Sequence, residues 1–530
     1  MDNDLKINSR IKILLIMFLG LSVRVFNLNG QGLCLPEVKV VCFAQMALST
    51  LFDFTDAYRP LYILIARPWI RVFGTNEIAV RMLPVLIGVF SLFLIYNVGR
   101  RLWDERTGLI SAFILSLSVF HVYFSRHGKG VYALLVFLSL SSFILMLKII
   151  ENNKWSTHIL NVLLHMFILL AHPFGIFWVA TQNTCYFILN GSRDKKRWII
   201  SLFILTMLLI PWYFYVISFN PERDAGNFSL PNLTVFPQLL EVFSCGGMHL
   251  ASAGESYAMS PDNMVGSWLL MLIYISIFFL ELLPSNRKAA CPVKTFGCGD
   301  LRKRMTLLVW LMLPLILIFI YSRIIRPIYW PRYVIYAAPA YYLLIGNFIS
   351  RLEVKKRAII LLLIGLFSLF ALKNVYYPER KGDIRDGVRF LEENLKDGDT
   401  IIISPAEMIG IIWYYWQDHD RRLLENIDDE RGLKVDGRWE NDFIFKKHRI
   451  INLQFSQISR FDDDFDFEEF KLGEKRIWFF YSPDWMLNGN SRFLDVFLRQ
   501  RYNLVTGKFF AYDNFWVKCF KTAGDGREGR

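Results

Sequence analysis

The sequence has 530 residues, 54% of them hydrophobic, and a mean hydropathy of +0.32. Soluble domains are about 45–50% apolar, so this chain carries more apolar surface than a soluble protein of its length would bury, and a membrane protein is expected. The formal net charge of +13 does not indicate a nucleic-acid partner, because the basic residues lie in short runs between apolar segments of membrane-spanning length. The seven cysteines form no CxxC pair and no zinc-type Cys/His spacing, so no chemistry is assigned to them.

Eleven apolar segments, each about as long as a membrane helix, follow one another from the N-terminus. They lie near residues 12–28, 79–98, 108–124, 131–150, 157–171, 173–190, 198–218, 264–283, 305–322, 331–349 and 357–373. No small-residue cleavage site follows the first segment, which predicts an uncleaved anchor helix. The stretch 157–190 is expected to form two short helices, because Pro173 ends the first one at His172.

Basic clusters give an independent check on the number of crossings. They are Lys6/Arg10/Lys12, Arg100/Arg101/Arg106, Lys148/Lys154, Arg193/Lys195/Lys196/Arg197, the stretch 287–304 and Arg351/Lys355/Lys356/Arg357. Two crossings separate each cluster from the next, so all of them lie on one side, which the positive-inside rule makes the cytoplasm. The N-terminus is therefore expected in the cytoplasm. The loops of about 29–77 and 219–262, and the chain after about residue 374, are expected outside it.

The chain after residue 373 changes to a mixture of acidic and basic residues, which divides the sequence into a transmembrane domain over 1–373 and a soluble domain over 374–530. In this second part, helices are predicted over 384–395, 406–416 and 491–500, and strands over 400–404, 449–452 and 476–481. A terminal hairpin follows. These elements predict a small extracytoplasmic α/β domain.

Several motifs occur in a fixed order between about residues 10 and 350. The first are L-x-x-R-x-x-x-L (Leu21, Arg24, Leu28), GLCLPE, RPLYIL, WIRVFG and IAVRMLPVLIGVFSL. They are followed by GRRLWDERTGLISA, SVFHVYFSRHGKGVYALL, LLAHPFGIF and WPRYVIYAAPA. This order resembles the GT-C-type polyprenyl-phosphate-sugar glycosyltransferases, in the group of the protein mannosyltransferases, aminoarabinose transferases and RgtA/B/C/D-like bacterial members.

The resemblance implies an α-helical polytopic membrane protein of the GT-C type, with about 11 transmembrane helices and the soluble domain at its C-terminus. It also implies a plasma-membrane enzyme, in the inner membrane of a bacterium. The implied donor is a polyprenyl-phosphate-linked sugar, presented in the membrane lipid. The implied acceptor is an extracytoplasmic lipid, glycan or protein.

The two external loops depart from the pattern that the family usually shows. The first loop of the family usually reads L-W-x-D-E. The Asp of this pattern is the base or metal-linked carboxylate that activates the acceptor. In this chain Pro36 occupies the position of the Asp, and only Glu37 matches the pattern. The second loop usually reads S-x-E-A-R-x-Y, whereas this chain has S-R-H-G-K-G-V-Y from Ser125 to Tyr132, without a carboxylate. The resemblance therefore implies Glu37 as the catalytic base, and no cofactor is assigned, with a divalent metal left open.

The expected chemistry needs cations as well as a base. Displacing a lipid phosphate from an anomeric carbon develops negative charge on the phosphate, which fixed cations in a water-poor site stabilise. Glu37 would accept the proton of the acceptor hydroxyl. The candidate phosphate-binding residues are Arg126, His127, Lys129 and Arg332, and the further cavity candidates are Arg59, Tyr62, Tyr132, His172 and Tyr333.

Other interpretations of the same residues remain open. Arg126, Lys129 and Arg332 are also typical of head-group anchors at helix ends, and His172 of a hydrogen-bonded interior histidine. The altered loops would fit a catalytically inactive family member that binds a lipid-linked glycan. Many helices with intramembrane charges would fit a transporter or flippase, although the sequence lacks the two related halves common in that class.

Overall fold

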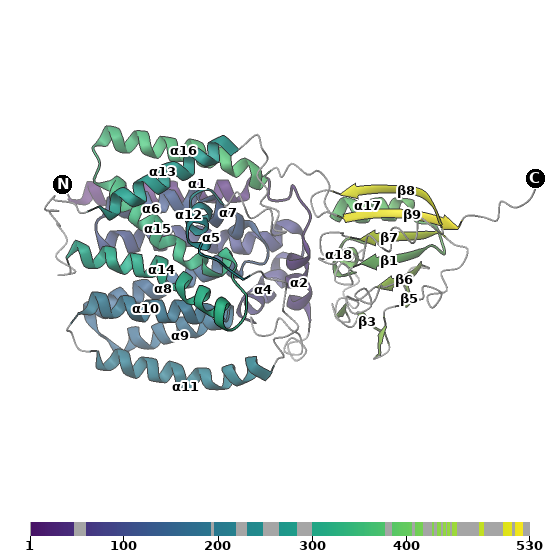
Figure 1. The fold of residues 1–530 in the computed structure, drawn as a ribbon, viewed down its shortest axis with the longest axis horizontal. Helices are drawn as coiled ribbons and strands as arrows, with labels where there is room; N and C mark the ends of the chain where they lie inside the picture. Colours follow the sequence, from purple (N-terminus) through teal and green to yellow (C-terminus); the bar gives the residue numbers. More distant parts are fainter. Residues whose placement is uncertain are drawn as a thin grey trace, which may run out of the picture. The chain divides into compact units, whose positions relative to one another are not determined.

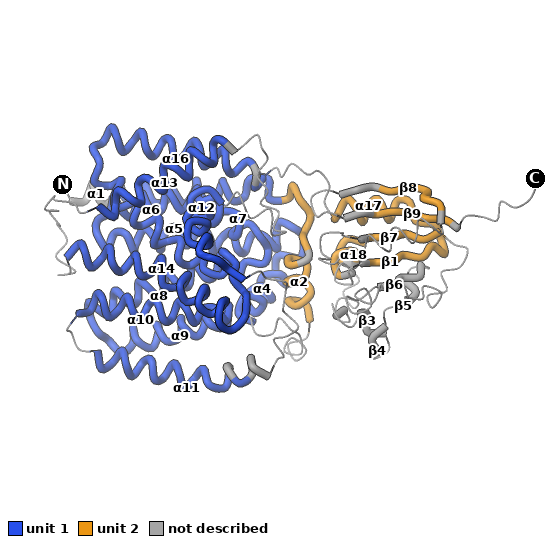
Figure 2. The backbone as a smooth tube through the Cα atoms, viewed as in Figure 1, with its two compact units in different colours: residues 1–28, 52–377 blue, residues 29–51, 378–530 orange. Residues whose placement is uncertain are grey.

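The computed structural model (Figure 1) describes most of the helical part of the chain and the strands of its C-terminal part. The described residues are 2–46, 60–191, 195–218, 230–246, 264–283, 299–376, 384–404, 409–416, 427–428, 432–435, 438–440, 442–445, 448–452, 476–481, 502–510 and 515–522. The chain forms two compact units (Figure 2): unit 1 contains Met1–Leu28 and Phe52–Tyr377, and unit 2 contains Asn29–Leu51 and Pro378–Arg530. The segment after the first helix thus belongs to the same unit as the C-terminal tail. The placement of residues 1–373 in the membrane and of 374–530 outside the cell stays a prediction.

Unit 1 is a bundle of helices that run side by side (Figure 1). They are α1 (Asp2–Val25), α4 (Pro60–Phe73), α5 (Glu77–Leu102), α6 (Glu105–Leu117), α7 (Val119–Arg126), α8 (Val131–Asn152), α9 (Trp155–Ala171), α10 (Gly175–Asn190), α11 (Lys196–Ser218), α12 (Val235–Cys245), α13 (Met264–Leu282), α14 (Asp300–Ile324), the 3-10 helix η5 (Pro331–Ala337), α15 (Ala338–Ser350) and α16 (Val354–Tyr376). Each apolar segment predicted from the sequence contains a helix. The predicted break at His172 is confirmed, because α9 ends at Ala171 and α10 begins at Gly175.

Two of the predicted segments are not single α-helices. Segment 108–124 is divided into α6 and α7, which meet at Ser118 with a bend of 60°. Segment 331–349 begins as the 3-10 helix η5 and continues as α15. Both segments were predicted only by their apolar extent. The bend at Ser118 has no Pro or Gly beside it in the sequence, whereas Pro339 lies in the first turn of α15, where η5 ends.

Five of the described helices are long and apolar enough to cross a membrane, or six if the bent pair α6–α7 forms one span. The five are α5, α8, α13, α14 and the continuous pair η5–α15. The chain is therefore an integral membrane protein. The count of eleven crossings and the side on which each loop lies stay predictions.

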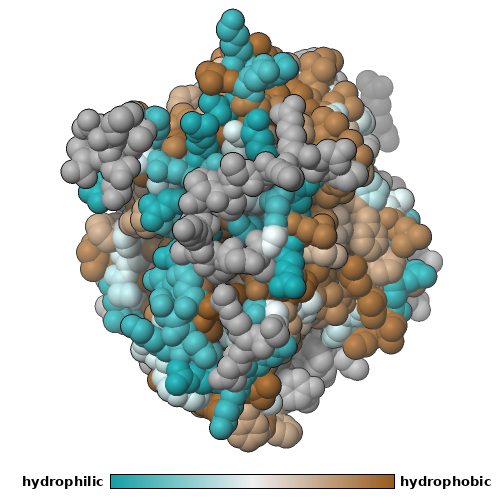
Figure 3. Space-filling model, turned by 90° about the vertical axis from the view of Figure 1, so that its left-hand side faces the viewer, coloured by the Kyte–Doolittle hydropathy of each residue, from teal (hydrophilic) through white to brown (hydrophobic). Residues whose placement is uncertain are grey.

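Charged side chains at one end of unit 1 pair with each other. Glu281, which is 1% exposed, accepts a hydrogen bond from Asn347 Nδ2 at 2.8 Å, and it forms ion pairs with Arg304, whose Nε lies 3.2 Å from Glu281 Oε1, and with Arg351. This joins the C-terminal ends of α13 and α15 to the first turns of α14. Figure 3 looks onto the side of the molecule where α1 begins in Figure 1, and hydrophilic side chains gather across it between hydrophobic ones.

Helices α5 and α6 approach each other closely at two glycines. A Cβ on Gly108 would lie 2.4 Å from the backbone oxygen of Tyr96, and one on Gly99 would lie 2.8 Å from Gly108 Cα. Small residues allow this approach of helix backbones within a membrane. The glycines therefore set the distance between the two helices.

Gly108→Ala is expected to lower the midpoint of thermal unfolding of the purified protein in detergent. The new methyl group would collide with a backbone oxygen, and overpacking of this kind costs about 1–3 kcal/mol. Gly365→Ala in α16 is the matched control, because its Cβ would lie 3.6 Å from the nearest atom, Phe113 Cζ. Ala favours a helix over Gly by about 1 kcal/mol, so the control should be neutral or stabilising. Equal shifts for both variants would contradict the close approach.

Unit 2 contains a mixed six-stranded sheet in the order β5-β6-β1-β7-β9-β8. Strand β1 (Thr400–Ser404) is parallel to β6 (His448–Asn452) and to β7 (Ile477–Tyr481). Strands β5 (Asp442–Phe445), β9 (Phe515–Thr522) and β8 (Tyr502–Phe510) are each antiparallel to their neighbours. A second sheet contains β2 (Ile427–Asp428), β3 (Gly432–Val435) and β4 (Arg438–Glu440).

Three helices accompany these sheets in unit 2: α17 (Ile384–Asn394), α18 (Ile409–Trp416) and, from the first loop, α2 (Leu35–Gln45). The predicted helices near 384–395 and 406–416, the three predicted strands and the terminal hairpin are confirmed. The helix predicted over 491–500 lies outside the described residues. The small α/β domain is thus present as predicted, and α2 is an addition to it that the sequence pattern did not indicate.

Candidate active site

Four side chains that the sequence singled out meet at one end of unit 1. Tyr132 lies in the first turn of α8, His172 between α9 and α10, and Arg332 and Tyr333 in η5. The ring centre of His172 is 6.2 Å from that of Tyr132 and 5.2 Å from that of Tyr333. The guanidinium carbon of Arg332 is 5.8 Å from the Tyr132 ring centre and 5.4 Å from the Tyr333 ring centre. These four residues form the Arg332 cluster.

Proline at 173 explains why His172 stands between two helices. Proline lacks the N–H of a helix interior and disfavours helical backbone in the preceding residue, and His172 is extended, with φ −160° and ψ 133°. Its Nδ1 accepts the N–H of Phe174 at 3.2 Å, and the Tyr336 hydroxyl donates to the Phe174 carbonyl at 3.0 Å. With Nδ1 as acceptor, a neutral His172 carries its proton on Nε2. His172 is 2% exposed, so the cluster contains a buried N–H donor of fixed orientation.

Arg332 is surrounded by aromatic rings. Pro331 occupies the first turn of η5, and Trp330 before it is extended. The guanidinium carbon lies 5.4 Å from the ring centre of Trp330, in addition to its contacts with Tyr132 and Tyr333. Each cation–π contact is worth about 0.5–1 kcal/mol at an exposed site and more when desolvated. Three rings therefore hold one positive charge whose planar N–H fork has the geometry that binds phosphate.

The turn between α7 and α8 carries two further candidates, His127 and Lys129. His127 Nδ1 accepts the N–H of Lys129 at 3.1 Å. A Cβ on Gly130 would lie 2.6 Å from the Tyr62 hydroxyl, so Tyr62 of α4, which is 3% exposed, packs directly against this turn. Two basic residues, a tyrosine and the start of α8 thus come together. Arg59, the remaining candidate of the first loop, lies outside the described residues.

Arg126, the first basic residue of the same turn, binds the end of α1. Its Nη1 donates to the carbonyls of Arg24 at 2.5 Å and Phe26 at 2.6 Å, and its Nη2 donates to the carbonyl of Asn27 at 3.2 Å. Its guanidinium carbon also lies 4.8 Å from the ring centre of Tyr376. Arginine side chains commonly bind the last carbonyls of a helix in this way. Arg126 thus has a structural role, and phosphate binding by Arg126 stays a prediction.

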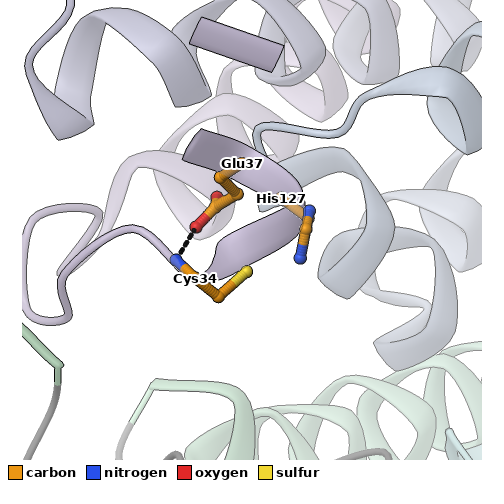
Figure 4. A group of neighbouring side chains, drawn as sticks. All are labelled: Cys34, Glu37 and His127. Carbon is orange, nitrogen blue, oxygen red and sulfur yellow. Dashed lines mark hydrogen bonds between the residues drawn. The ribbon is translucent and has the colours of Figure 1, made fainter. Parts of the chain in front are cut away.

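Glu37 lies in α2, which belongs to unit 2. Its Oε2 accepts the N–H of Cys34 at 3.0 Å (Figure 4), and the carboxylate caps the first turn of α2. Glu37 is 1% exposed. A thiol and a carboxylate are ligand types that metals use, and Cys34 and Glu37 supply one of each. Divalent metal binding stays a prediction.

The sequence quoted Arg24 only as part of a motif, yet its contacts support the turn that carries the candidate site. Arg24 is 0% exposed. Its Nε donates to Ser125 Oγ at 2.8 Å, its Nη2 lies 2.8 Å from His121 Nδ1, and its Nη1 donates to the carbonyls of Gly20 at 2.9 Å and Ser116 at 3.0 Å. The Ser116 carbonyl lacks a helical partner because α6 ends at the next residue. Arg24 therefore satisfies the backbone at the bend and fixes the start and end of α7.

Tyr329 is a second residue that the sequence analysis missed. It lies in the segment between α14 and η5, and its buried hydroxyl has no hydrogen-bond partner among the described residues. Burial raises the pKa of this hydroxyl above its ordinary value, so it stays protonated at neutral pH. A protonated, buried hydroxyl three residues before Arg332 is a further candidate donor to a ligand.

Comparison with known proteins shows what this architecture resembles. The family model described as dolichyl-phosphate-mannose-protein mannosyltransferase matches residues 57–215. The crystal structure of ArnT from Cupriavidus metallidurans in the apo state matches 96% of this chain and 97% of its own, with 12% sequence identity and a TM-score of 0.54. This chain has the ArnT fold. The same ArnT bound to undecaprenyl phosphate matches over the same shares, with a TM-score of 0.52.

The ArnT fold confirms the resemblance to GT-C glycosyltransferases that the motifs indicated, including the α/β domain at the C-terminus. Sequence relatives are more distant. A protein of Aquifex aeolicus described as uncharacterized is 22% identical over 219 residues, and dolichyl-phosphooligosaccharide-protein glycotransferase 1 of Pyrococcus horikoshii is 25% identical over 207 residues. These matches cover 38% and 36% of this chain and span only 43% and 21% of the two relatives' own lengths.

Proposed function

We propose that this protein is a membrane glycosyltransferase that transfers a sugar from a polyprenyl-phosphate donor to an extracytoplasmic lipid, glycan or protein. The observation that carries the proposal is the ArnT fold, which matches 96% of the chain. One of the two matching ArnT crystal structures contains bound undecaprenyl phosphate. The matched family model, which describes dolichyl-phosphate-mannose-protein mannosyltransferases, supports a lipid-phosphate sugar as donor. We place the enzyme in the inner (plasma) membrane of a bacterium, with its N-terminus in the cytoplasm and its C-terminal domain outside.

The Arg332 cluster supplies the groups that such a donor would need. A phosphate that leaves the anomeric carbon gains negative charge, and a fixed guanidinium stabilises that charge without reorganisation at the moment of reaction. Arg332 is held by three aromatic rings, and Lys129 in the turn between α7 and α8 adds a further positive charge. The Nε2–H of His172 can donate to a phosphate or sugar oxygen. We assign donor phosphate binding to Arg332, His127 and Lys129, and cavity roles to Tyr62, Tyr132, His172 and Tyr333.

Glu37 is the proposed general base. A carboxylate that accepts the proton of the acceptor hydroxyl raises its nucleophilicity as the new bond to the anomeric carbon forms. The oxygen of the acceptor attacks, the bond to the phosphate oxygen breaks, and the polyprenyl phosphate leaves with the bonding electron pair. A single in-line displacement inverts the configuration of the sugar carbon.

The second candidate function is a non-catalytic protein that binds a lipid-linked glycan. Pro36 in the position of the family's first-loop Asp, and the second loop without a carboxylate, favour it. Both functions require donor binding, and only the first requires turnover. The two are therefore separated by one experiment.

That experiment measures sugar transfer by the purified protein in nanodiscs from a panel of undecaprenyl-phosphate hexoses and pentoses. Release of undecaprenyl phosphate from at least one donor, with none from nucleotide sugars, is the expected result. Donor binding without release from any donor would support the non-catalytic function. The absence of both donor binding and undecaprenyl phosphate release would refute both functions. Repeating the active reaction with EDTA and then with added Mg²⁺ or Mn²⁺ tests the divalent metal.

Arg332→Ala is expected to lower kcat/KM for the lipid donor by about 10-fold to 100-fold. Hydrogen bonds to charged groups contribute about 1.5–3 kcal/mol, which corresponds to this range. Arg332→Lys keeps a charge but lacks the planar fork and should lie between the wild type and the Ala variant. Arg323→Ala is the matched control, because Arg323 is an exposed arginine in the last turn of α14. Equal losses in the Arg323 and Arg332 variants would remove Arg332 from the donor site.

A further inference from the structure

The segment that carries Glu37 is part of the C-terminal domain in three dimensions. Residues Asn29–Leu51 join Pro378–Arg530 in unit 2, although about 330 residues of unit 1 separate them in the sequence. Helix α2 packs against α18 of the C-terminal domain. The position of Glu37 therefore depends on residues that lie far from it in the chain.

One hydrogen bond and one close approach fix the beginning of this segment. The backbone N–H of Leu33 donates to the hydroxyl of Tyr415 in α18. A Cβ on Gly32 would lie only 2.8 Å from the same hydroxyl oxygen and 3.0 Å from Arg385 Cβ of α17. Leu33 itself is 1% exposed. The chain before α2 thus lies directly against α17 and α18, at a distance that glycine permits.

Leu33, which binds Tyr415, lies four positions before Glu37 in the chain, so the backbone connects the Tyr415 contact to Glu37. Leu33 is followed by Cys34, which is extended (φ −81°, ψ 167°) and caps α2. The N–H of Cys34 donates to Glu37 Oε2 at 3.0 Å, so the carboxylate is bound to the backbone next to Leu33. Val38 after Glu37 is 0% exposed, which fixes the helix face on which Glu37 lies. A shift of Leu33 would therefore move the Cys34 amide and the carboxylate that it binds.

We propose that Tyr415 is a positioning residue for Glu37, and that the C-terminal domain sets the orientation of the proposed base through the Tyr415–Leu33 hydrogen bond. The inference rests on the proposed function in that it takes Glu37 as the general base. Tyr415 touches neither donor nor acceptor in this mechanism. Its loss should change the rate of the step that uses the base and leave donor affinity unchanged, because we assign donor binding to residues of unit 1.

The test uses the full-length protein in nanodiscs with Tyr415→Phe. Removing the hydroxyl frees the Leu33 amide, so hydrogen–deuterium exchange of the peptide over residues 29–46 should be faster than in the wild type. In the transfer assay, kcat should fall by about 10-fold to 100-fold, the range expected for a misplaced catalytic group, with the donor KM unchanged. Gly32→Ala should reproduce both effects, because its methyl group would displace the Tyr415 hydroxyl.

Tyr414→Phe is the matched control, since it removes a hydroxyl from the adjacent ring of α18, 4.7 Å from the Tyr415 ring centre, and leaves the Leu33 contact intact. Unchanged exchange in Tyr415→Phe would overturn the inference, and so would faster exchange with an unchanged kcat. A parallel rise of the donor KM would indicate general loss of structure and would also overturn it. If the wild type turns over no donor, the proposed function fails, while the exchange measurement still decides whether Tyr415 holds the segment of Glu37.

Discussion

Glu37→Gln is expected to reduce sugar transfer by about 10²-fold to 10⁴-fold, the usual contribution of a general base. The substitution keeps the size of the side chain and an oxygen that can still accept the N–H of Cys34, which Glu37 Oε2 now accepts at 3.0 Å. It removes only the capacity to take a proton from the acceptor. The measurement is kcat for release of undecaprenyl phosphate in nanodiscs, with donor affinity measured separately.

Glu77→Gln is the control for this prediction, because Glu77 is also an acid in the first turn of a helix, α5. It should keep turnover near the wild-type value. If Glu37→Gln turns over donor as fast as the wild type, the protein stays an enzyme and Glu37 loses its role. In that case another acid would have to act as the base, or the acceptor would need none.

Arg24→Met is expected to prevent stable folding, or to lower the midpoint of thermal unfolding by more than any other substitution considered. Met fills a similar volume but makes none of the hydrogen bonds of Arg24 with Ser125, His121 and the carbonyls of Gly20 and Ser116. A buried polar group without its partner costs about 1–3 kcal/mol. Several such groups together approach the whole stability of a typical domain, about 5–15 kcal/mol. The measurement is the monodisperse yield and the unfolding midpoint in detergent.

Two variants separate the hydrogen bonds of Arg24 from its charge. Arg10→Met removes an exposed arginine of the same helix α1 and should leave the midpoint unchanged. Arg24→Lys keeps the charge, but one ammonium group cannot replace donors that point to five separate acceptors, so it should also be strongly destabilised. A midpoint for Arg24→Lys close to the wild type would show that the charge, and not the network, matters at this position.

Much of the helical architecture could be predicted from the sequence, because each apolar run is a local feature. The break at His172 followed from Pro173, which acts on its immediate neighbours. Strand β1 was predicted at residues 400–404, the bounds that the structure has, because β-branched residues such as isoleucine are enriched in strands. The grouping of His172 with Tyr132, Arg332 and Tyr333 was also consistent with the expectation that external helix ends would meet.

Other features depended on contacts between residues far apart in the chain, and periodicity carries no information about those. The bend at Ser118 has no proline or glycine to announce it, and Arg24, 92 residues before Ser116, binds the carbonyl that the bend exposes. Arg126 is predicted as a phosphate ligand, and that role stays a prediction, but no sequence pattern indicated that its guanidinium binds carbonyls about 100 residues away. The sequence shows that Arg24 and Arg126 are charged. Their hydrogen-bond partners become known only from the packing of α1 against α7.

The sequence by itself predicted a helical membrane protein with an α/β tail, since hydropathy and turn chemistry are properties of short segments, and its motifs resembled those of the GT-C glycosyltransferases. Only the tertiary structure decided that residues 29–51 belong with that tail. The reason is physical: the Leu33 amide needs an acceptor, and the Tyr415 hydroxyl, 382 residues away, provides it. Folding brings such partners together, and no local pattern records which ones will meet.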